Sequence, residues 1–230
     1  MKHLDLFSGI GGFALAARNV GWETVGFVEI DPYCQKVLQK NFPGVPIHED
    51  VMNYEGQECE VLSAGFPCQP YSQAGEQRGE DDDRNLWPEV MRIIHNIRPT
   101  WVVAENVAGF INMGLDKALS DLEGEGYSWL PLVLPACAVN APHKRERLFL
   151  ISHSERDEQP RKESRSREVG RVGRQQQSLS WDRTWEDAVA HARRVDDGVS
   201  GRVVTDRTDA IRNSIVPQIA EIIFGAINET

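Results

Sequence analysis

Short apolar runs alternate with segments of helical spacing over residues 1–153. The runs that read as strands are His3–Phe7, Thr24–Glu29, Glu60–Ala64, Trp101–Glu105, Leu130–Ala138 and Arg147–Ser152. The segments that read as helices are Gly12–Val20, Pro32–Asn41, Asn85–Ile97 and Leu115–Glu125. Strands that alternate with helices are typical of a parallel sheet covered by helices. The pattern therefore predicts an α/β fold, with an open, mostly parallel sheet and helices on both faces.

The apolar periodicity is nearly lost after Ser154, where Arg, Gln, Ser, Glu and Asp dominate. Helical spacing returns near the carboxyl end, through Ile215, Ile219, Ile222 and Ile223. These changes predict a first domain over residues 1–153, a short irregular polar insertion over 154–201, and a helix within 202–230 that returns to the first domain.

The composition is that of an ordinary soluble globular protein, with 40% hydrophobic and 26% charged residues in 230. No apolar run is long enough to span a bilayer, so we expect no membrane association. The four cysteines, Cys34, Cys59, Cys68 and Cys137, have no spacing typical of a zinc site or a disulfide framework. We therefore expect free thiols, no bound metal, a cytoplasmic location and a monomer.

The formal net charge of −10 argues at first against a polyanionic partner. The distribution of charge matters more than the sum. Six basic residues stand against two acids, Glu163 and Glu168, within one part of the insertion, which gives a local charge of +4. The basic residues are Arg161, Lys162, Arg165, Arg167, Arg171 and Arg174. This segment can contact phosphates, with Arg161, Lys162 and Arg165 as the first candidates.

A glycine-rich loop, Ser8-Gly9-Ile10-Gly11-Gly12, follows the first predicted strand and opens a helix. Glycines let the backbone approach a ligand closely, and such turns in open sheets bind nucleotides. Glu29 ends the second strand, where a carboxylate can accept hydrogen bonds from ribose hydroxyls, and Asp50 can accept one from an adenine amino group. The loop lacks a full GxGxxG pattern and follows Asp5, which favours the sulfonium of S-adenosyl-L-methionine over the pyrophosphate of NAD.

Cys68 lies in Phe66-Pro67-Cys68-Gln69-Pro70, a loop of turn-forming residues after an apolar strand. Glu105 follows the next strand, and Arg145 and Arg147 share one face of a later strand at a period of two. A thiolate, an acid and two guanidinium groups suit methylation of carbon 5 of cytosine. The thiolate adds to carbon 6, the acid holds ring nitrogen 3, and the arginines bind the base carbonyl and lower the thiol pKa.

These residues resemble the DNA (cytosine-5) methyltransferase family, in a short form similar to solitary phage and prophage enzymes. The resemblance implies a Rossmann-like methyltransferase fold and covalent catalysis through Cys68, with Glu105, Arg145 and Arg147, on a cytosine flipped out of double-stranded DNA. The cofactor contacts it implies are Asp5, Phe7, Ser8, Gly9, Ile10, Gly11, Gly12, Glu29, Ile30, Asp50, Val51, Pro67, Asn213 and Ser214. The DNA contacts it implies are Gln69, Ser72 and Asn106 beside Arg161, Lys162 and Arg165.

The sequence departs from the family pattern in three places. His143 stands where the family has Gln, Arg212 stands where the late motif has Gly, and the insertion is shorter than the usual target-recognition domain. Three other interpretations remain open: a catalytically weakened DNA-binding relic, a tRNA cytosine-5 methyltransferase, and a dehydrogenase. The Pro-Cys-Gln-Pro motif argues against the tRNA enzyme, and the loop spacing argues against the dehydrogenase.

Overall fold

The computed structural model describes residues 1–67, 85–141, 143–154, 209–210 and 213–230. The strands are β1 (Lys2–Leu6), β2 (Glu23–Val28), β3 (Ile47–His48), β4 (Val61–Gly65), β5 (Trp101–Val107), β6 (Tyr127–Pro135) and β7 (Glu146–Ser154). The α-helices are α1 (Gly12–Asn19), α2 (Pro32–Asn41), α3 (Trp87–Ile97), α4 (Leu115–Gly124) and α7 (Pro217–Asn228). Short 3-10 helices lie at Val51–Asn53, Ala108–Asn112 and Ala136–Val139.

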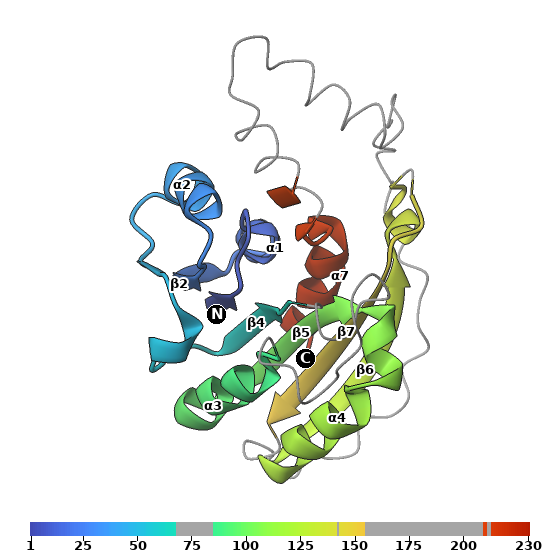
Figure 1. Cartoon of the computed structure of the whole chain (residues 1–230). Helices are drawn as coiled ribbons and strands as arrows, with labels where there is room; N and C mark the ends of the chain where they lie inside the picture. Colours follow the sequence, from blue (N-terminus) through green and yellow to red (C-terminus); the bar gives the residue numbers. More distant parts are fainter. Residues whose placement is uncertain (68–84, 142, 155–208, 211–212) are drawn as a thin grey trace.

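The strands form one seven-stranded sheet in the order β3-β2-β1-β4-β5-β7-β6 (Figure 1). Strands β1 to β5 pair in parallel, whereas β7 pairs antiparallel with both β5 and β6. The strand order reverses between β1 and β4, and ligands of open α/β sheets bind outside the carboxyl ends of the strands at such a point. The topology therefore directs attention to the loops that follow β1 and β4.

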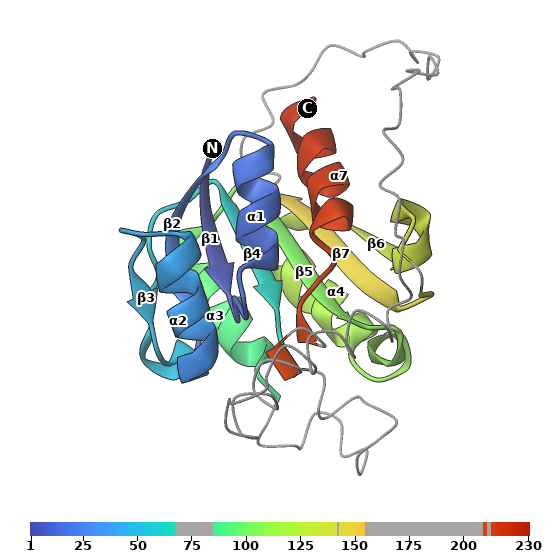
Figure 2. The same ribbon diagram turned by 90° about the horizontal axis from the view of Figure 1, so that it is seen from above.

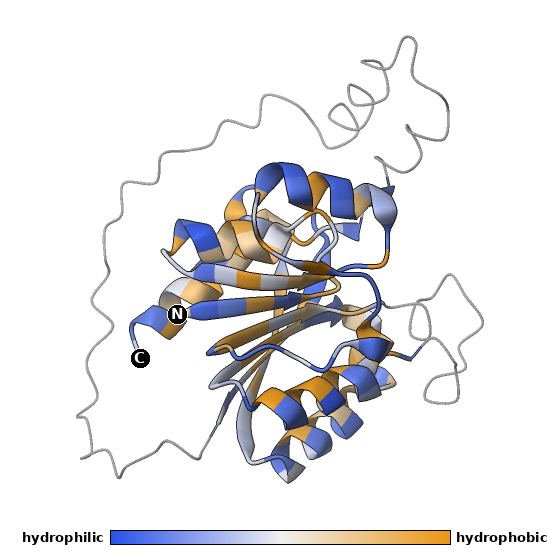
Figure 3. Ribbon diagram, turned by 90° about the vertical axis from the view of Figure 1, so that its left-hand side faces the viewer, coloured by the Kyte–Doolittle hydropathy of each residue, from blue (hydrophilic) through white to orange (hydrophobic). Residues whose placement is uncertain are grey.

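Helices cover both faces of the sheet, as the sequence predicted. One apolar core joins the sheet to α3 and α4 through side chains such as Val90, Ile93 and Leu122. On the other face, α1 and α7 share a second core, and α2 packs through Leu38. Figure 3 shows orange and blue residues alternating along the helices, as amphipathic helices require. The predicted fold class is confirmed.

The last helix packs beside the first (Figure 2). The Trp22 and Phe224 rings stack with centroids 4.6 Å apart, and Trp22 Nε1 donates to Asn228 Oδ1 over 2.6 Å. Helix α7 of the predicted segment 202–230 thus packs on α1. The division into domains stays a prediction, because most of the predicted insertion, residues 155–201, lies outside the described residues.

Several predicted boundaries were wrong. The strand predicted at Leu130–Ala138 is β6, which begins at Tyr127 and ends at Pro135, and residues Ala136–Val139 form a 3-10 turn instead. Strand β5 continues past Glu105 to Val107, because its partner β7 reaches that far along it. The two-residue β3 was absent from the predicted strands, since two residues are too short to show a period.

Candidate active site

The glycine-rich loop is bent by left-handed backbone positions. Phe7, Gly9 and Gly11 have φ angles of 56°, 52° and 88°. Gly11 N donates to Ser8 O over 2.9 Å, and Ser8 Oγ donates to Asp5 O over 2.7 Å. A β-carbon at Gly9 would meet no atom within 4 Å. The loop is thus held by its own backbone and keeps open space beside Gly9, as a ligand-binding turn requires.

Glu29 fastens this loop to the end of β2. Its Oε2 accepts from Gly9 N over 2.6 Å, and its Oε1 accepts from Asp31 N over 2.8 Å. Burial raises the pKa of Glu29, while these two N–H groups oppose the rise. The neighbouring Ile30 is a large apolar residue with 74% of its surface exposed. An acid and an uncovered apolar side chain therefore stand together next to the loop.

Asp50 lies after β3, at the start of a 3-10 turn. Its Oδ1 accepts from Met52 N over 2.9 Å, and its Oδ2 accepts from Asn53 Nδ2 over 3.1 Å. Val51 beside it is buried, whereas Met52 is 55% exposed. The turn thus holds the Asp50 carboxylate in one place at the same edge of the sheet as Glu29.

Asp5 lies beneath the glycine-rich loop. The side chain is fully buried on β1, and Oδ1 accepts from Ser63 Oγ of β4 over 2.6 Å. Ser63 Oγ also lies 2.8 Å from His3 Nε2, and burial raises the pKa of Asp5 well above its usual range. The Asp5 side chain thus ties β1 to β4, and its contact with a cofactor stays a prediction.

Strand β4 ends at Gly65 and leads through Phe66 and Pro67 to Cys68. Cys68, Gln69 and Ser72 lie outside the described residues, as do Arg161, Lys162 and Arg165. Phe66 is buried and packs against the Trp87 and Phe110 rings, and Pro67 is exposed. The chain therefore leaves the sheet for Cys68 at the edge where the glycine-rich loop also lies.

Asn106 supports this exit rather than facing solvent. Only 3% of its surface is exposed, its Nδ2 donates to Phe66 O over 3.4 Å, and its Oδ1 accepts from Val107 N over 2.8 Å. The Asn106 side chain therefore positions the residues before Cys68, and its contact with DNA stays a prediction.

Glu105 lies opposite Gly65, the last residue of β4, and is 8% exposed. Arg147 on β7 forms an ion pair with it, with 3.0 Å between Arg147 Nε and Glu105 Oε1. Burial raises the pKa of Glu105 to about 7, against the opposing charges of Arg147 and Arg145. A carboxyl group with this pKa can both donate and accept a proton near neutral pH.

Arg145 does not share a strand face with Arg147. It lies one residue before β7 begins and has a φ of 34°, which is not an extended backbone conformation. The strand alternation that was predicted to include Arg145 therefore starts after it. Its Nη2 donates instead to Ser214 O over 2.7 Å. Its charge still reaches Glu105, and burial together with Arg147 lowers its own pKa. The two arginines thus lie near one acid but contact different partners.

The segment around Ser214 lies directly against the glycine-rich loop. A β-carbon at Gly12 would stand 2.7 Å from Ile215 Cγ1 and 3.2 Å from Ser214 Oγ. A β-carbon at Gly65 would stand 3.7 Å from Glu105 Oε2 and 3.9 Å from Ile215 Cγ2. The structure therefore brings together the loop, the late segment, the end of β4 and the acid. Asn213 is exposed beside them, and Arg212 lies outside the described residues.

Ser63, Gly65 and Ile215 belong to this arrangement, although they were not among the predicted site residues. Ser63 is a single hydroxyl inside an apolar strand, Gly65 is one glycine among 19, and Ile215 fits a helical face. Alternation along β4 places Ser63 and Gly65 on one side of the strand, and that pattern was the available signal.

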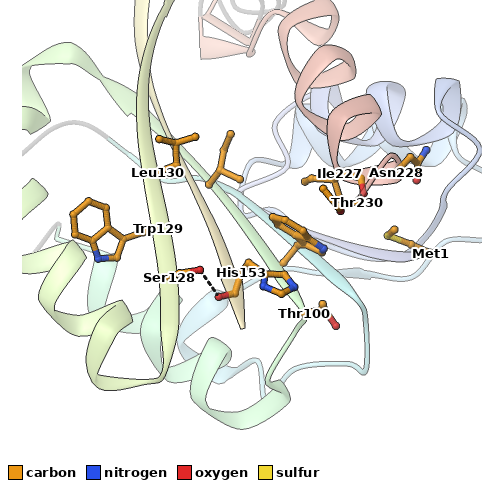
Figure 4. Close-up of a pocket in the computed structure, with 11 residues that line it drawn as sticks. Met1, Thr100, Ser128, Trp129, Leu130, His153, Ile227, Asn228 and Thr230 are labelled. Atoms are coloured by element: carbon orange, nitrogen blue, oxygen red, sulfur yellow. Dashed lines mark hydrogen bonds between the residues drawn. The ribbon is translucent and has the colours of Figure 1, made fainter. Parts of the chain in front are cut away.

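A separate cavity of about 510 Å³ lies at the opposite edge of the sheet (Figure 4). It is bounded by residues such as Met1, Trp101, His153 and Ile227, and the Trp101 and His153 rings are 4.4 Å apart. The predicted site residues are not among those that line it. In the described part of the chain no group of three His, Cys, Asp or Glu side chains is arranged to hold a metal ion. No helix in that part is long and apolar enough to cross a membrane.

Comparison with known proteins gives one consistent result. Residues 1–194 match the family described as C-5 cytosine-specific DNA methylase. The type II methyltransferase M2.BsuMI of Bacillus subtilis is 38% identical over 162 residues, which cover 66% of this chain and 42% of that protein. The type II methyltransferase M.HhaI of Haemophilus parahaemolyticus is 35% identical over 158 residues, with 66% and 48% covered.

Solved structures agree with this match. A putative DNA modification methyltransferase encoded within an Escherichia coli prophage superposes with a TM-score of 0.57 at 28% identity, over 67% of this chain and 47% of that one. Spodoptera frugiperda DNMT2 has the same fold, with a TM-score of 0.56 at 23% identity over 74% and 55%. The chain spans less than half the length of the two curated relatives described above.

Proposed function

Because the chain belongs to the C-5 cytosine-specific DNA methylase family, we propose that it transfers a methyl group from S-adenosyl-L-methionine to carbon 5 of cytosine in double-stranded DNA. The observation that carries this proposal is the buried Glu105–Arg147 pair beside the end of β4, the strand that leads to Cys68. An acid with a pKa of about 7 at that place suits a cytosine ring nitrogen that must be protonated during attack.

The residues around the glycine-rich loop fit an adenosine cofactor. Open space beside Gly9 admits a ligand, and the exposed Ile30 side chain offers an apolar surface for a purine ring. Glu29 and Asp50 present carboxylates whose remaining lone pairs can accept from ribose hydroxyls and an adenine amino group. Phe7, Val51, Pro67, Asn213 and Ser214 surround this space in the proposal. S-adenosyl-L-methionine, when bound, supplies the methyl group as an electrophilic sulfonium substituent.

In the proposed chemistry Cys68 acts as a thiolate. Its sulfur forms a bond to carbon 6 of a flipped-out cytosine, and Glu105 gives its proton to ring nitrogen 3 as the 5,6 double bond is broken. Carbon 5 then takes the methyl group, and S-adenosylhomocysteine is left. A base removes the carbon 5 proton, the carbon–sulfur bond breaks to restore the thiolate, and nitrogen 3 returns its proton to Glu105. Arg147 holds Glu105 and the base carbonyl.

The DNA contacts in this proposal come from two places. Gln69 and Ser72, which follow the nucleophile, would contact the target nucleotide. The basic part of the insertion, with Arg161, Lys162 and Arg165, would neutralise phosphates as a short target-recognition region. The proposal includes a monomeric enzyme in the cytoplasm, divided into the catalytic domain 1–153, the insertion 154–201 and the returning segment 202–230.

Bisulfite sequencing of plasmid DNA tests the proposal. Cells that lack cytosine methylation express the full chain or its Cys68→Ala variant, at matched protein levels. We expect protected cytosines in one fixed sequence context with the full chain and none with the variant, because the adduct cannot form without the thiolate. Protection that persists in Cys68→Ala contradicts the covalent mechanism. Absence of protection in both indicates a relic without activity on DNA, and the same assay on transfer RNA then tests the RNA alternative.

A further inference from the structure

The late segment, residues 213–216, has local hydrogen bonds in the described structure: Ser214 N donates to Ala210 O and Ser214 Oγ donates to Ile215 O, each over 3.1 Å. It precedes α7 and crosses to the glycine-rich loop, where Ile215 fills the space that the absent side chain of Gly12 leaves. Ile215 and Val216 also pack against the core that α1 and α7 share. Apolar packing and local bonds do not fix the orientation of the segment relative to the loop. The segment therefore needs a directed contact if its backbone is to keep one position beside the loop.

Arg145 supplies that contact. Its Nη2 donates to the Ser214 carbonyl over 2.7 Å, across 69 residues of sequence. Hydrogen bonds that involve a charged group are about twice as strong as neutral ones, and a guanidinium has a fixed fork geometry. The same residue has a φ of 34°, so the chain bends at Arg145, just before β7 begins. Arg147, only two residues away, contacts the acid Glu105 instead.

We propose that Arg145 is a positioning residue that holds the late segment on the glycine-rich loop, and so shapes the cofactor pocket from a distance, while Arg147 serves the acid. This inference rests on the proposed function for the identity of the cofactor. It departs from the expectation that both arginines bind the base. The contact also links the two halves of the site, because Ile215 packs near Gly65 and Glu105 as well as against Gly12.

Binding of S-adenosylhomocysteine, measured by calorimetry, separates the two arginines. We expect Arg145→Gln to weaken this binding about tenfold, which corresponds to ~1.4 kcal/mol, the range of one charge-assisted hydrogen bond. Arg147→Gln is the matched control and should change binding by less than about twofold. In methylation assays Arg145→Gln should raise KM for the cofactor, whereas Arg147→Gln should lower kcat. Equal effects of the two variants on binding and on KM would overturn the inference.

Hydrogen exchange gives a measurement that needs no cofactor. Peptides covering residues 213–216 should exchange faster in Arg145→Gln than in the parent protein, and at the parent rate in Arg147→Gln. Ile215→Ala removes the apolar contact of the same segment. The increase in exchange rate at 213–216 in the double variant should therefore be less than the sum of the increases in Ile215→Ala and Arg145→Gln. Arg145→Lys keeps the charge but loses the guanidinium fork. If Arg145→Gln fails to fold, Arg145→Lys replaces it in the binding and exchange measurements.

The outcomes distinguish the two proposals. If the parent chain binds no S-adenosylhomocysteine, the proposed function fails, and exchange alone decides the role of Arg145 in the fold. If the parent binds and Arg145→Gln binds equally well with unchanged exchange at 213–216, only the positioning role fails.

Discussion

The glycine-rich loop after β1 and the acid pair on β5 and β7 lie at the same edge of the sheet but are stabilised in different ways. The loop is held by backbone groups, such as Gly11 N to Ser8 O and Gly9 N to Glu29. The acid is held by a side-chain ion pair in a buried place. The loop should therefore respond to added volume more than to the charge of Glu105, and the acid should show the opposite sensitivities.

Glu105→Gln should have the largest effect. The amide is nearly the same size as the carboxyl group but cannot transfer a proton to the base, so kcat should fall by roughly 100- to 10,000-fold. Binding of S-adenosylhomocysteine should change by less than about twofold, because the loop does not depend on this charge. Single-turnover kinetics and calorimetry measure the two quantities. A similar loss of kcat and of cofactor binding would mean that Glu105 has a structural role in the whole site.

Gly12→Ala should have the next largest effect, on the other half of the site. The new β-carbon would stand 2.7 Å from Ile215 Cγ1, which forces the late segment to move. Overpacking of this kind costs ~1–3 kcal/mol, so cofactor binding should weaken by roughly 10- to 100-fold. Gly225→Ala on α7 is the matched control, because its β-carbon would meet no atom within 4 Å. Unchanged binding in Gly12→Ala would show that the late segment can move to make room for the new β-carbon without affecting the cofactor pocket.

The pH dependence of the rate should show the smallest effect. Since Glu105 acts in its protonated form and its pKa is about 7, kcat/KM should fall by up to about tenfold per pH unit above that value once the Cys68 thiol is ionised. Arg147 is the strongest influence that lowers this pKa, so Arg147→Gln should move the falling limb to higher pH, by about one unit. The comparison is made on profiles normalised to their maxima. If the falling part of the pH profile lies at the same pH in both proteins, the ionisation of another group determines it.

The periodicity of the sequence was sufficient for the fold class and for the loop. Strands buried on both faces, such as Val61–Gly65 and Trp101–Val107, read as apolar runs, and glycines after β1 mark a turn in almost any context. The antiparallel entry of β7 was not predicted, because direction in a sheet depends on distant pairing rather than on local pattern.

The candidate site was predicted as a set of residues but not as a set of contacts. The side chains of Asp5 and Asn106 are both buried: Asp5 is bonded to the Ser63 hydroxyl, and Asn106 is bonded to the backbone at Phe66. Arg145 was expected on a strand, but it lies before β7 and has a positive φ angle. Such errors arise because a polar side chain next to a loop looks the same in sequence whether it faces outward or inward.

Met1 and Thr230 line the same cavity (Figure 4). In an engineered variant, residues 1 and 230 could therefore be joined by a short linker. The chain could then be reopened elsewhere, as a circular permutant in which the late segment and α7 precede the glycine-rich loop in one continuous stretch. In that order the two parts of the proposed cofactor pocket would be neighbours in sequence as well as in space.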